Sequence, residues 1–180
     1  MAICNLTRDL LKSTTCAYSL PEITDIYLAN YNDVATSAGT LSDSGSCSAE
    51  VVTNIALDDG KKFYHIEPMK NSVDFTDELV TGDTGNKYRT HTLTFSTPGA
   101  YDECMHMDFD ALSLGRFIGV VKTADEKYLM LGRVAGLEAS SATLSGGKNG
   151  NGVTITLTAN ATESAMPIKE SEISKVTGTN

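Results

Sequence analysis

The feature of this sequence that most constrains the fold is a strict two-residue alternation of apolar side chains with threonine. It is clearest in residues 153–159, where the apolar positions are Val153, Ile155 and Leu157. Because successive side chains of a β-strand point to opposite faces, the alternation predicts a strand with one apolar and one polar face. Threonine is itself enriched in strands. The pattern therefore favours a β-domain over a helical bundle.

A long hairpin is predicted over residues 72–97, with limbs at 72–80 and 88–97. Its tip is a turn-forming segment that consists of Thr81, Gly82, Asp83, Thr84, Gly85 and Asn86. Glycine and asparagine tolerate the backbone conformations of tight turns. The return limb alternates a face of tyrosine and threonine with a face of Arg89, His91, Leu93 and Phe95. Neither face is apolar enough for a deep core, so we expect a protruding ribbon that needs a partner.

Further strands are expected before this hairpin. Residues 22–30 form a strand whose apolar positions slip once, as at a β-bulge. Residues 32–48 are polar and are predicted to form a loop. The strand at 50–57 ends in Asp58-Asp59-Gly60, a turn signal that predicts a hairpin with residues 61–67.

One helix is predicted over residues 98–114. Thr97 can cap it, Pro98 suits its first turn, and Gly115 ends it. Its apolar stripe at helical spacing consists of Tyr101, Cys104, Met105, Phe109 and Leu112.

After the helix, the chain returns to strands. Short apolar strands are expected at 117–121 and 128–131, followed by a strand at 134–143 in which Gly136 indicates a bulge. A glycine-rich turn over 145–152 precedes the alternating strand, and residues 166–168 close the core.

These elements predict a mainly β fold: an antiparallel β-sandwich or barrel with one flanking α-helix and a long protruding hairpin. Residues 1–20 are predicted to form an N-terminal arm and residues 21–168 the domain. The hairpin is an excursion at 72–97 and the helix occupies 98–114. Residues 169–180 are expected to be a C-terminal tail, frayed or bound to a partner.

Net charge argues against a nucleic-acid-binding module. The chain of 180 residues has a formal charge of −9, whereas DNA affinity comes from lysine and arginine that displace phosphate counterions. The four cysteines, which are Cys4, Cys16, Cys47 and Cys104, show no C-x-x-C spacing, so we expect free thiols in a reducing compartment. We expect no signal peptide and no membrane span, because no long apolar run is present.

No pattern of catalytic or metal-ligating residues is found. Cys104, His106 and Asp108 lie two residues apart, so only the first and last share a helix face. Gly147 and Lys148 superficially match a phosphate-binding loop, but Ala142 stands where its first glycine should be. We therefore expect no enzymatic activity, no cofactor and no metal.

A polar hairpin and two loose arms favour self-assembly. A monomer would leave these pieces as exposed liabilities, whereas strand addition at a sheet edge gives affinity through main-chain hydrogen bonds. Open-ended stacking needs different patches on the two sides of each subunit. The alternative, that the hairpin is an ordinary surface loop, stays open on the residues alone.

Residues 50–168 resemble the tail tube proteins of tailed bacteriophages, especially those of phages and prophages of Bacteroides-type gut bacteria. The resemblance is carried by a Gly-Leu-Glu strand in 128–138, a glycine-rich turn, a threonine-alternating strand at 152–158, and Ala-Met-Pro-Ile at 165–168. The order of hairpin and helix also matches. No invariant chemical motif is involved.

The resemblance implies a structural virion protein, not an enzyme. Members form β-sandwiches or barrels with a flanking helix, and six copies form a ring whose inner strands line a continuous lumen. Rings stack through a long hairpin and terminal arms, and DNA passes down the lumen during ejection. For this chain the stacking loop would be 72–97 with its tip at 81–86. Expected partners are copies of itself and other tail or neck proteins, with DNA only as non-specific cargo and no membrane.

An acidic lumen would repel phosphates and let DNA slide. Asp25 and Glu50 are the candidate lumen residues, since they lie in strands whose opposite face is apolar. Two alternatives stay open. One is a neck or portal-proximal ring, or a tail-completion protein, with the same fold. The other is a β-domain that binds a small ligand, although aromatic residues make up only 7% of the chain.

Overall fold

The computed structural model describes residues 22–42, 48–98, 103–146 and 152–178. It is mainly β, and its strands pair antiparallel, as predicted. The elements are β1 Ile23–Asn30, the 3₁₀ helix η1 Tyr31–Asp33, β2 Val34–Ser42, β3 Ser48–Leu57, β4 Tyr64–Ile66, β5 Asp74–Thr81, β6 Lys87–Pro98, α1 Glu103–Leu114, β7 Arg116–Thr123, β8 Tyr128–Leu131, β9 Leu137–Ser145, β10 Gly152–Ala161, β11 Met166–Pro167 and α2 Glu170–Thr177.

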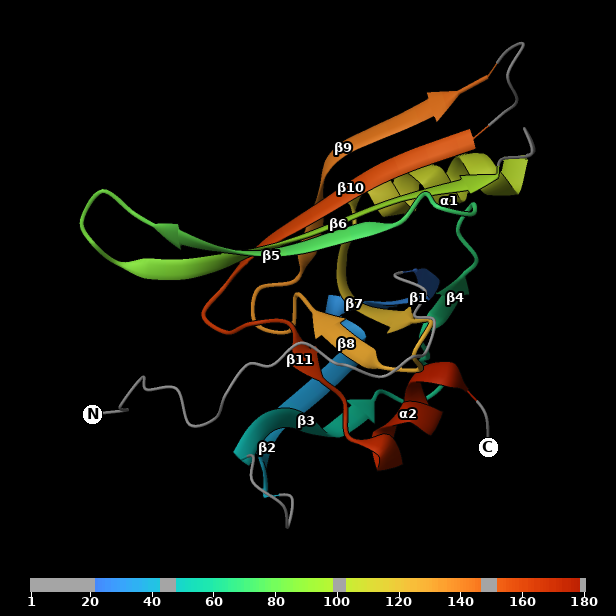
Figure 1. Ribbon diagram of the computed structural model, residues 1–180. Coiled ribbons are helices and arrows are strands. Elements are labelled where there is room, and N and C mark those ends of the chain that lie inside the picture. The colour runs from blue at the N-terminus through green and yellow to red at the C-terminus, as the bar shows by residue number, and fades with distance from the viewer. Residues whose placement is uncertain (1–21, 43–47, 99–102, 147–151, 179–180) are drawn as a thin grey trace, which may run out of the picture.

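The strands lie in three levels in Figure 1. At the top, β9, β10, β6 and β5 are neighbours in that order, with α1 beside them. In the middle, β7 pairs with β1 and β8, while β4 and β11 extend this level at its two sides. At the bottom, β2 and β3 form a two-stranded sheet next to α2. The top and middle levels are continuous because β9 begins beside the start of β7.

The middle level separates two hydrophobic clusters. Along β1, Ile26 and Leu28 pack into the upper cluster with Leu93 and Phe95, whereas Tyr27 and Ala29 pack into the lower cluster. Residues buried on both faces need no polar alternation, so β1 and β7 contain unbroken apolar runs. Burial of each large apolar side chain contributes roughly 1.5–3 kcal/mol, which makes these two clusters the main source of stability.

Several predicted elements are confirmed. The apolar face of β10 is buried, and Met166 and Ile168 close the lower cluster. The slip in β1 is a register shift between Ile23 and Asp25 against β7. The strands at 117–121 and 128–131 form the β7–β8 pair.

The prediction of a loop over 32–48 is wrong for residues 34–42, which form β2 and pair with β3 along its length. The side chains of β2 from Val34 to Thr40 are exposed or half-buried, whereas Val52 and Ile55 on its partner β3 are buried in the lower cluster. Burial therefore selects apolar residues on β3 far more than on β2. The hairpin predicted across Asp58-Asp59-Gly60 is also wrong. The turn forms, with Gly60 at φ 71°, but β4 pairs with β1 and not with β3. A local turn signal does not determine which strand becomes the tertiary neighbour.

The predicted start of the helix needs correction. Thr97 and Pro98 are not its cap and first turn, because both are the last residues of β6 and lie opposite β10. The described helix runs from Glu103 to Leu114. Phe109 and Leu112 pack against the upper cluster, but Cys104 is exposed. Gly136, expected as a bulge, precedes β9 and closes a turn by donating its N–H to the Gly132 carbonyl.

The C-terminal segment is not a frayed tail over its described part. Residues Glu170–Thr177 form a second helix, α2, that packs against β3. Val176 and Ile173 contact the lower cluster, and Gly178 ends the helix in the left-handed conformation. Glu172 accepts the backbone N–H of Ile55 and Lys175 donates to the Ile55 carbonyl. These polar contacts attach α2 to β3, whereas a frayed segment was expected. The predicted arm at 1–20 lies outside the described residues.

Candidate functional site

One face of the top level is covered with hydroxyl groups. Cross-strand pairing places the threonines of β6 and β10 opposite one another, so they share a face. We call this the hydroxyl face; its Ser and Thr members are Thr76, Thr90, Thr92, Thr94, Ser96, Ser141, Thr143, Ser145, Thr154, Thr156 and Thr158. The opposite face of β6 and β10 is buried in the upper cluster.

Hydrogen bonds between side chains run across this face. The hydroxyls of Thr94 and Thr156 lie 3.1 Å apart, and those of Ser96 and Thr154 lie 2.8 Å apart. Thr90 donates to the side chain of Asn160 over 3.2 Å. These contacts satisfy part of the hydroxyl groups within the sheet and leave a neutral, polar surface.

The charges on the hydroxyl face are acidic. Register places Asp74 opposite Thr94 and Glu78 opposite Thr90, so these two of the three carboxylates of β5 lie on this face. Both are exposed, and neither forms an ion pair within the described part of the chain. The four strands place no lysine or arginine among the described residues of this face. At its corner, Arg116 of β7 pairs with Glu138 over 3.5 Å.

Both outer edges of the four-stranded level lack a strand partner among the described residues. β5 pairs only with β6, and β9 pairs with β7 only at Leu137 and Glu138. Each edge carries a partly exposed leucine on the side opposite the hydroxyl face. Leu79 on β5 is 54% exposed and Leu144 on β9 is 46% exposed. Unpaired edges with apolar side chains are templates for strand addition.

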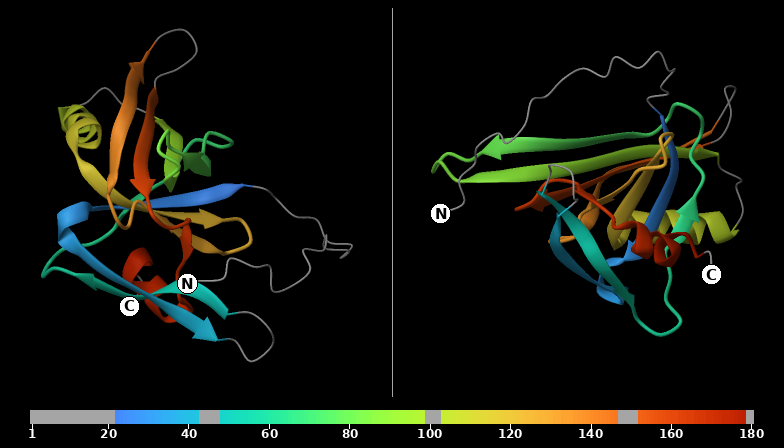
Figure 2. Two further views of the ribbon diagram at one scale, coloured as in Figure 1. Left: turned by 90° about the vertical axis from the view of Figure 1, so that its left-hand side faces the viewer. Right: turned by 60° about the horizontal axis from the view of Figure 1, so that its bottom comes forward.

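The predicted tip closes the β5–β6 hairpin as expected. The Gly82 N–H donates to the Asn86 carbonyl over 2.8 Å, and Thr84 donates its hydroxyl to the Asn86 side chain over 2.9 Å. Gly85 has φ 80°, which a residue with a side chain rarely adopts. Thr81, Asp83, Thr84 and Asn86 are exposed. The distal end of the hairpin extends beyond the other strands (Figures 1 and 2).

The rest of the predicted hairpin is not a free ribbon. β10 pairs with β6 from Pro98 down to Arg89, so only the part beyond Arg89 lies outside the four-stranded level. The prediction that neither face suits a deep core is wrong. His91, Leu93 and Phe95 are all buried, because β6 is an inner strand of the sheet and its inward face closes the upper cluster.

A network of charged residues holds the base of this hairpin. We call it the hairpin-base cluster; its members are Asp77, Arg89, His91, Arg133 and Glu163. The Asp77 carboxylate accepts hydrogen bonds from Arg89 Nε over 2.5 Å and from the backbone N–H of Ala165 over 2.9 Å. Arg133 forms a bidentate ion pair with Glu163, donating from Nε and Nη2 to the two carboxylate oxygens. The cluster thereby joins β5 and β6 to two connections of the body, those that follow β8 and β10.

Electrostatics within the hairpin-base cluster favour charged Asp77 and neutral His91. Burial raises the pKa of Asp77, but the Arg89 and Ala165 hydrogen bonds and the neighbouring positive charges outweigh burial and hold it below its usual value. Burial lowers the pKa of His91, and the opposing effects of Asp77 and Glu163 only partly offset this. The side chain of His91 is 1% exposed.

The two predicted lumen acids lie away from the hydroxyl face and from each other. Asp25 is on β1, where it contacts His65 Nε2 at 2.8 Å and Lys122 Nζ at 3.7 Å. Burial raises its pKa, but the hydrogen bonds from Thr24 and His65 and the charge of Lys122 outweigh burial and hold the pKa of Asp25 below its usual value. Glu50 is exposed on β3, opposite Thr40. Asp25 therefore has local ionic partners, and Glu50 belongs to the small sheet.

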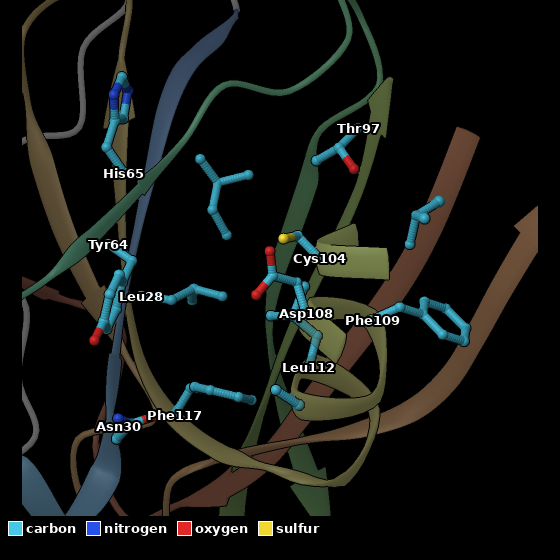
Figure 3. A pocket seen from close by; sticks show the side chains of 13 residues that line it. Leu28, Asn30, Tyr64, His65, Thr97, Cys104, Asp108, Phe109, Leu112 and Phe117 are labelled. Carbon is cyan, nitrogen blue, oxygen red and sulfur yellow. The ribbon is translucent and has the colours of Figure 1, made fainter. Parts of the chain in front are cut away.

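A groove lies between α1 and the β1–β4 pair (Figure 3). Its volume is about 750 Å³. Leu112 of α1 faces Leu28 and Phe117 across an apolar floor, and Cys104 and Asp108 stand on the α1 side. His65 also lines it, but its ring is paired with Asp25 and stacked on Tyr27. Cys104 and Asp108 lie one helical turn apart, and no hydrogen bond joins their side chains in the described part of the chain.

No helix in the described ranges combines the length and apolar character needed to cross a membrane. Within the same ranges, no three side chains of the metal-ligating types come close enough to share an ion. Among the described cysteines, Cys104 is a free, exposed thiol.

The functional features that sequence reasoning missed are Asp74, Glu78 and the hairpin-base cluster. Register places Asp74 and Glu78 on the hydroxyl face, and Asp77, Arg89 and His91 on the opposite face of β5 and β6. The sequence shows the alternation within each strand but not the pairing between strands. Compared with known proteins, the chain matches no family model, no curated protein and no solved structure.

Proposed function

We propose that this chain is a structural subunit of a tailed-phage tail tube, in which copies join edge to edge into rings that stack around a lumen for DNA. The observation that carries the proposal is the hydroxyl face. It is a four-stranded surface whose other side packs into the core and whose two outer strands have free edge positions among the described residues, and its four strands place no described lysine or arginine on it. The resemblance of residues 50–168 to tail tube proteins supports the same function.

Ring formation follows from the direction of the strands. Each neighbouring pair in the order β9, β10, β6 and β5 is antiparallel. With three such pairs between them, β9 and β5 also run in opposite directions. If β5 of one copy is placed beside β9 of the next, the junction is antiparallel like every other pair. The contact uses two different edges, so it is heterologous and closes into a ring when the rotation between copies permits.

The junction would also bury apolar surface. Leu79 on β5 and Leu144 on β9 lie on the same side of the sheet, and both are about half exposed. Register places Leu144 level with Thr97 of β6 and Leu79 level with Arg89, so the joined edges would cover the two leucines at opposite ends of the junction. Main-chain pairing would satisfy the edge N–H and carbonyl groups at the same time.

The hydroxyl face would then line the lumen. Neutral hydroxyls cannot displace the counterions of DNA phosphates as lysine and arginine do, and Asp74 and Glu78 would repel the phosphates, so DNA would slide without sticking. We place the lumen acids at Asp74 and Glu78 in preference to Asp25 and Glu50, because only the first two lie on this face. The exposed hairpin tip at 81–86 would contact the next ring, and α1 would lie outside the barrel.

The test is electron microscopy with light scattering over a concentration series. Rings or tubes with a central hole are expected for the wild-type chain; stacking supports a tube, and single rings support the neck-ring alternative. Leu79→Lys and Leu144→Lys should each abolish rings by placing a charge at the junction. Leu114→Lys is the matched control, because Leu114 is 88% exposed on α1 and belongs to neither edge strand.

Two outcomes would contradict the proposal. One is a wild-type protein that stays monomeric at every concentration, or that forms a two-fold dimer. The other is loss of assembly in Leu114→Lys together with normal rings in both edge variants, which would place the interface on α1.

A further inference from the structure

We propose that His91 is a proton-operated latch that ties the base of the β5–β6 hairpin to the body, and that its protonation releases the hairpin base. The inference concerns the subunit itself and does not depend on whether rings form. It rests on the hydrogen bonds of a buried imidazole that the proposed function does not use.

The latch works only with a neutral ring. Nδ1 of His91 accepts a hydrogen bond from the backbone N–H of Gly132 over 3.2 Å. Nε2 lies 3.1 Å from the carbonyl of Glu163, to which it must donate. Neutral imidazole has one acceptor and one donor nitrogen, which matches these partners, whereas imidazolium has two donors. A proton on Nδ1 would point at the Gly132 N–H, and one buried hydrogen bond would become a repulsive contact.

The Gly132 side of the contact cannot easily adjust. Gly132 has φ 69°, and a Cβ built at this position would lie 2.6 Å from a carbon of Leu137. Its carbonyl also accepts the N–H of Gly136. The turn between β8 and β9 is therefore confined, and relief of the repulsion must come from movement of β6 or of the turn as a whole.

His91 connects three pieces of the chain that are distant in sequence. It projects from β6, its Nδ1 binds the turn after β8, and its Nε2 binds the connection after β10. Asp77 on β5 makes a second bond to the connection after β10, because its carboxylate accepts the N–H of Ala165. Release of His91 would therefore loosen both strands of the hairpin at its base while leaving the β1–β7 core in place.

Four charged groups face the imidazole from the surrounding elements. Asp77 Oδ1 of β5 lies 3.5 Å from Nε2 and favours the proton, whereas Arg89 of β6 disfavours it. Glu163 also favours the proton, but its carboxylate is paired with Arg133. Desolvation outweighs the two acids, so the pKa of His91 lies below its usual 6.5. The latch is closed at neutral pH and opens as the pH falls through the lowered pKa of His91.

The experiment is amide hydrogen exchange by NMR on the full chain at pH 7.5 and at pH 5, corrected for intrinsic exchange rates. The amides of Gly132 and Ala165 should exchange at least tenfold faster at the lower pH, because their acceptors move away. The amides of Val120 and Val121, in the middle level, should keep their protection. Equal changes at all four amides, or no change at Gly132, would overturn the proposal.

Two substitutions distinguish protonation of His91 from an effect of low pH on the protein as a whole. In Asp77→Asn, loss of the negative charge should shift the midpoint of the Gly132 transition to lower pH; an unchanged or higher midpoint contradicts the latch. In His91→Gln, the side chain can still donate to the Glu163 carbonyl but cannot gain a proton, so the transition should vanish. His106→Gln is the control, since the side chain of His106 is 76% exposed on α1. The Gly132 transition of this variant should have the same midpoint as in the wild type.

Discussion

Ile155 and Thr154 are neighbours on β10, yet they contribute to the molecule in different ways. Ile155 is fully buried in the upper cluster, whereas Thr154 is exposed on the hydroxyl face. At the residue scale, the two-residue alternation therefore separates stability from surface chemistry. The same separation holds along β6 for Phe95 and Thr94.

We expect Ile155→Ala to lower the free energy of unfolding by about 2–5 kcal/mol, through lost burial and the cavity left behind. Thr154→Ala loses only the contact with Ser96 at an exposed site and should cost less than about 1 kcal/mol. Urea unfolding of both variants, with matched m-values, measures the difference. Equal losses would mean that the two faces of β10 do not differ in packing.

Glu172 gives a pH-dependent prediction. The residue is 8% exposed, and its carboxylate accepts hydrogen bonds from Lys175 Nζ at 2.7 Å and from the Ile55 N–H at 2.9 Å. The Lys175 hydrogen bond, followed by the Ile55 hydrogen bond, lowers its pKa below 4.5. A depressed carboxyl pKa stabilises the fold above the unfolded value, and this stability is lost as the pH falls through the folded value.

Glu172→Gln should therefore destabilise the protein by about 1 kcal/mol near pH 7, because the exposed ammonium of Lys175 loses an ionic partner. The difference from wild type should shrink as the pH drops below 4.5, where the wild-type carboxylate also gains a proton. Thermal unfolding of both proteins from pH 7 to pH 3.5 measures this. A difference that stays constant with pH would show that the charge of Glu172 has no role.

At the scale of elements, β6 and the hairpin tip have different roles although they belong to one hairpin. β6 is paired on both sides and closes the core, whereas the hydrogen bonds of the tip beyond Arg89 join, among the described residues, only parts of the hairpin itself. The fold should therefore tolerate loss of the tip and not loss of the strand. If the tip contacts the next ring, its removal should affect assembly alone.

Replacing residues 82–86 by Asn-Gly, a two-residue hairpin turn that keeps Thr81 paired with Lys87, should leave the melting temperature within a few degrees of wild type. The shortened subunit should still form single rings and should not form stacked tubes. Circular dichroism and electron microscopy on the same sample measure the two properties. An unfolded variant would show that the tip is needed for the core, and normal tubes would show that stacking uses another surface.

At the scale of the whole molecule, the position of the negative charge matters more than its total. The chain carries −9 overall, but acids on the hydroxyl face and acids on α1 would face opposite sides of a ring. Asp74 and Glu78 would meet DNA in the lumen, whereas Asp108 and Asp110 are exposed on the helix outside.

The double variant Asp74→Lys, Glu78→Lys should make assembled rings retain DNA, with binding that weakens steeply as salt rises. Asp108→Lys with Asp110→Lys changes the net charge by the same amount and is the control for non-specific attraction. Co-sedimentation of rings with linear DNA at two salt concentrations distinguishes them. Stronger retention by the α1 variant would place α1, and not the hydroxyl face, next to the DNA.

Local pattern by itself determined the mainly β character, the strands β7, β8 and β10, the bulge in β1 and the hairpin tip. Each of these depends on interactions within a few residues: alternation, apolar runs and turn chemistry. Pairing was decided only in the tertiary structure, because the partner of an edge depends on which apolar faces can be buried together. That is why β4 joined β1 in place of β3, and why β6 became an inner strand.

The residues of the candidate site also fall into two groups, those identifiable from local pattern and those brought together only by folding. The tip residues were identifiable because glycine and asparagine act locally, while Asp25 and Glu50 were chosen from alternation within single strands and proved to lie on other surfaces. Asp74 and Glu78 share a face with the threonines only through the register of β5 against β6. His91 appeared as one polar residue in an exposed ribbon, and only folding brought Gly132 and Glu163 to its two nitrogens. Hydrogen bonds between residues 41 and 72 positions apart depend on the packed core, which no local pattern specifies.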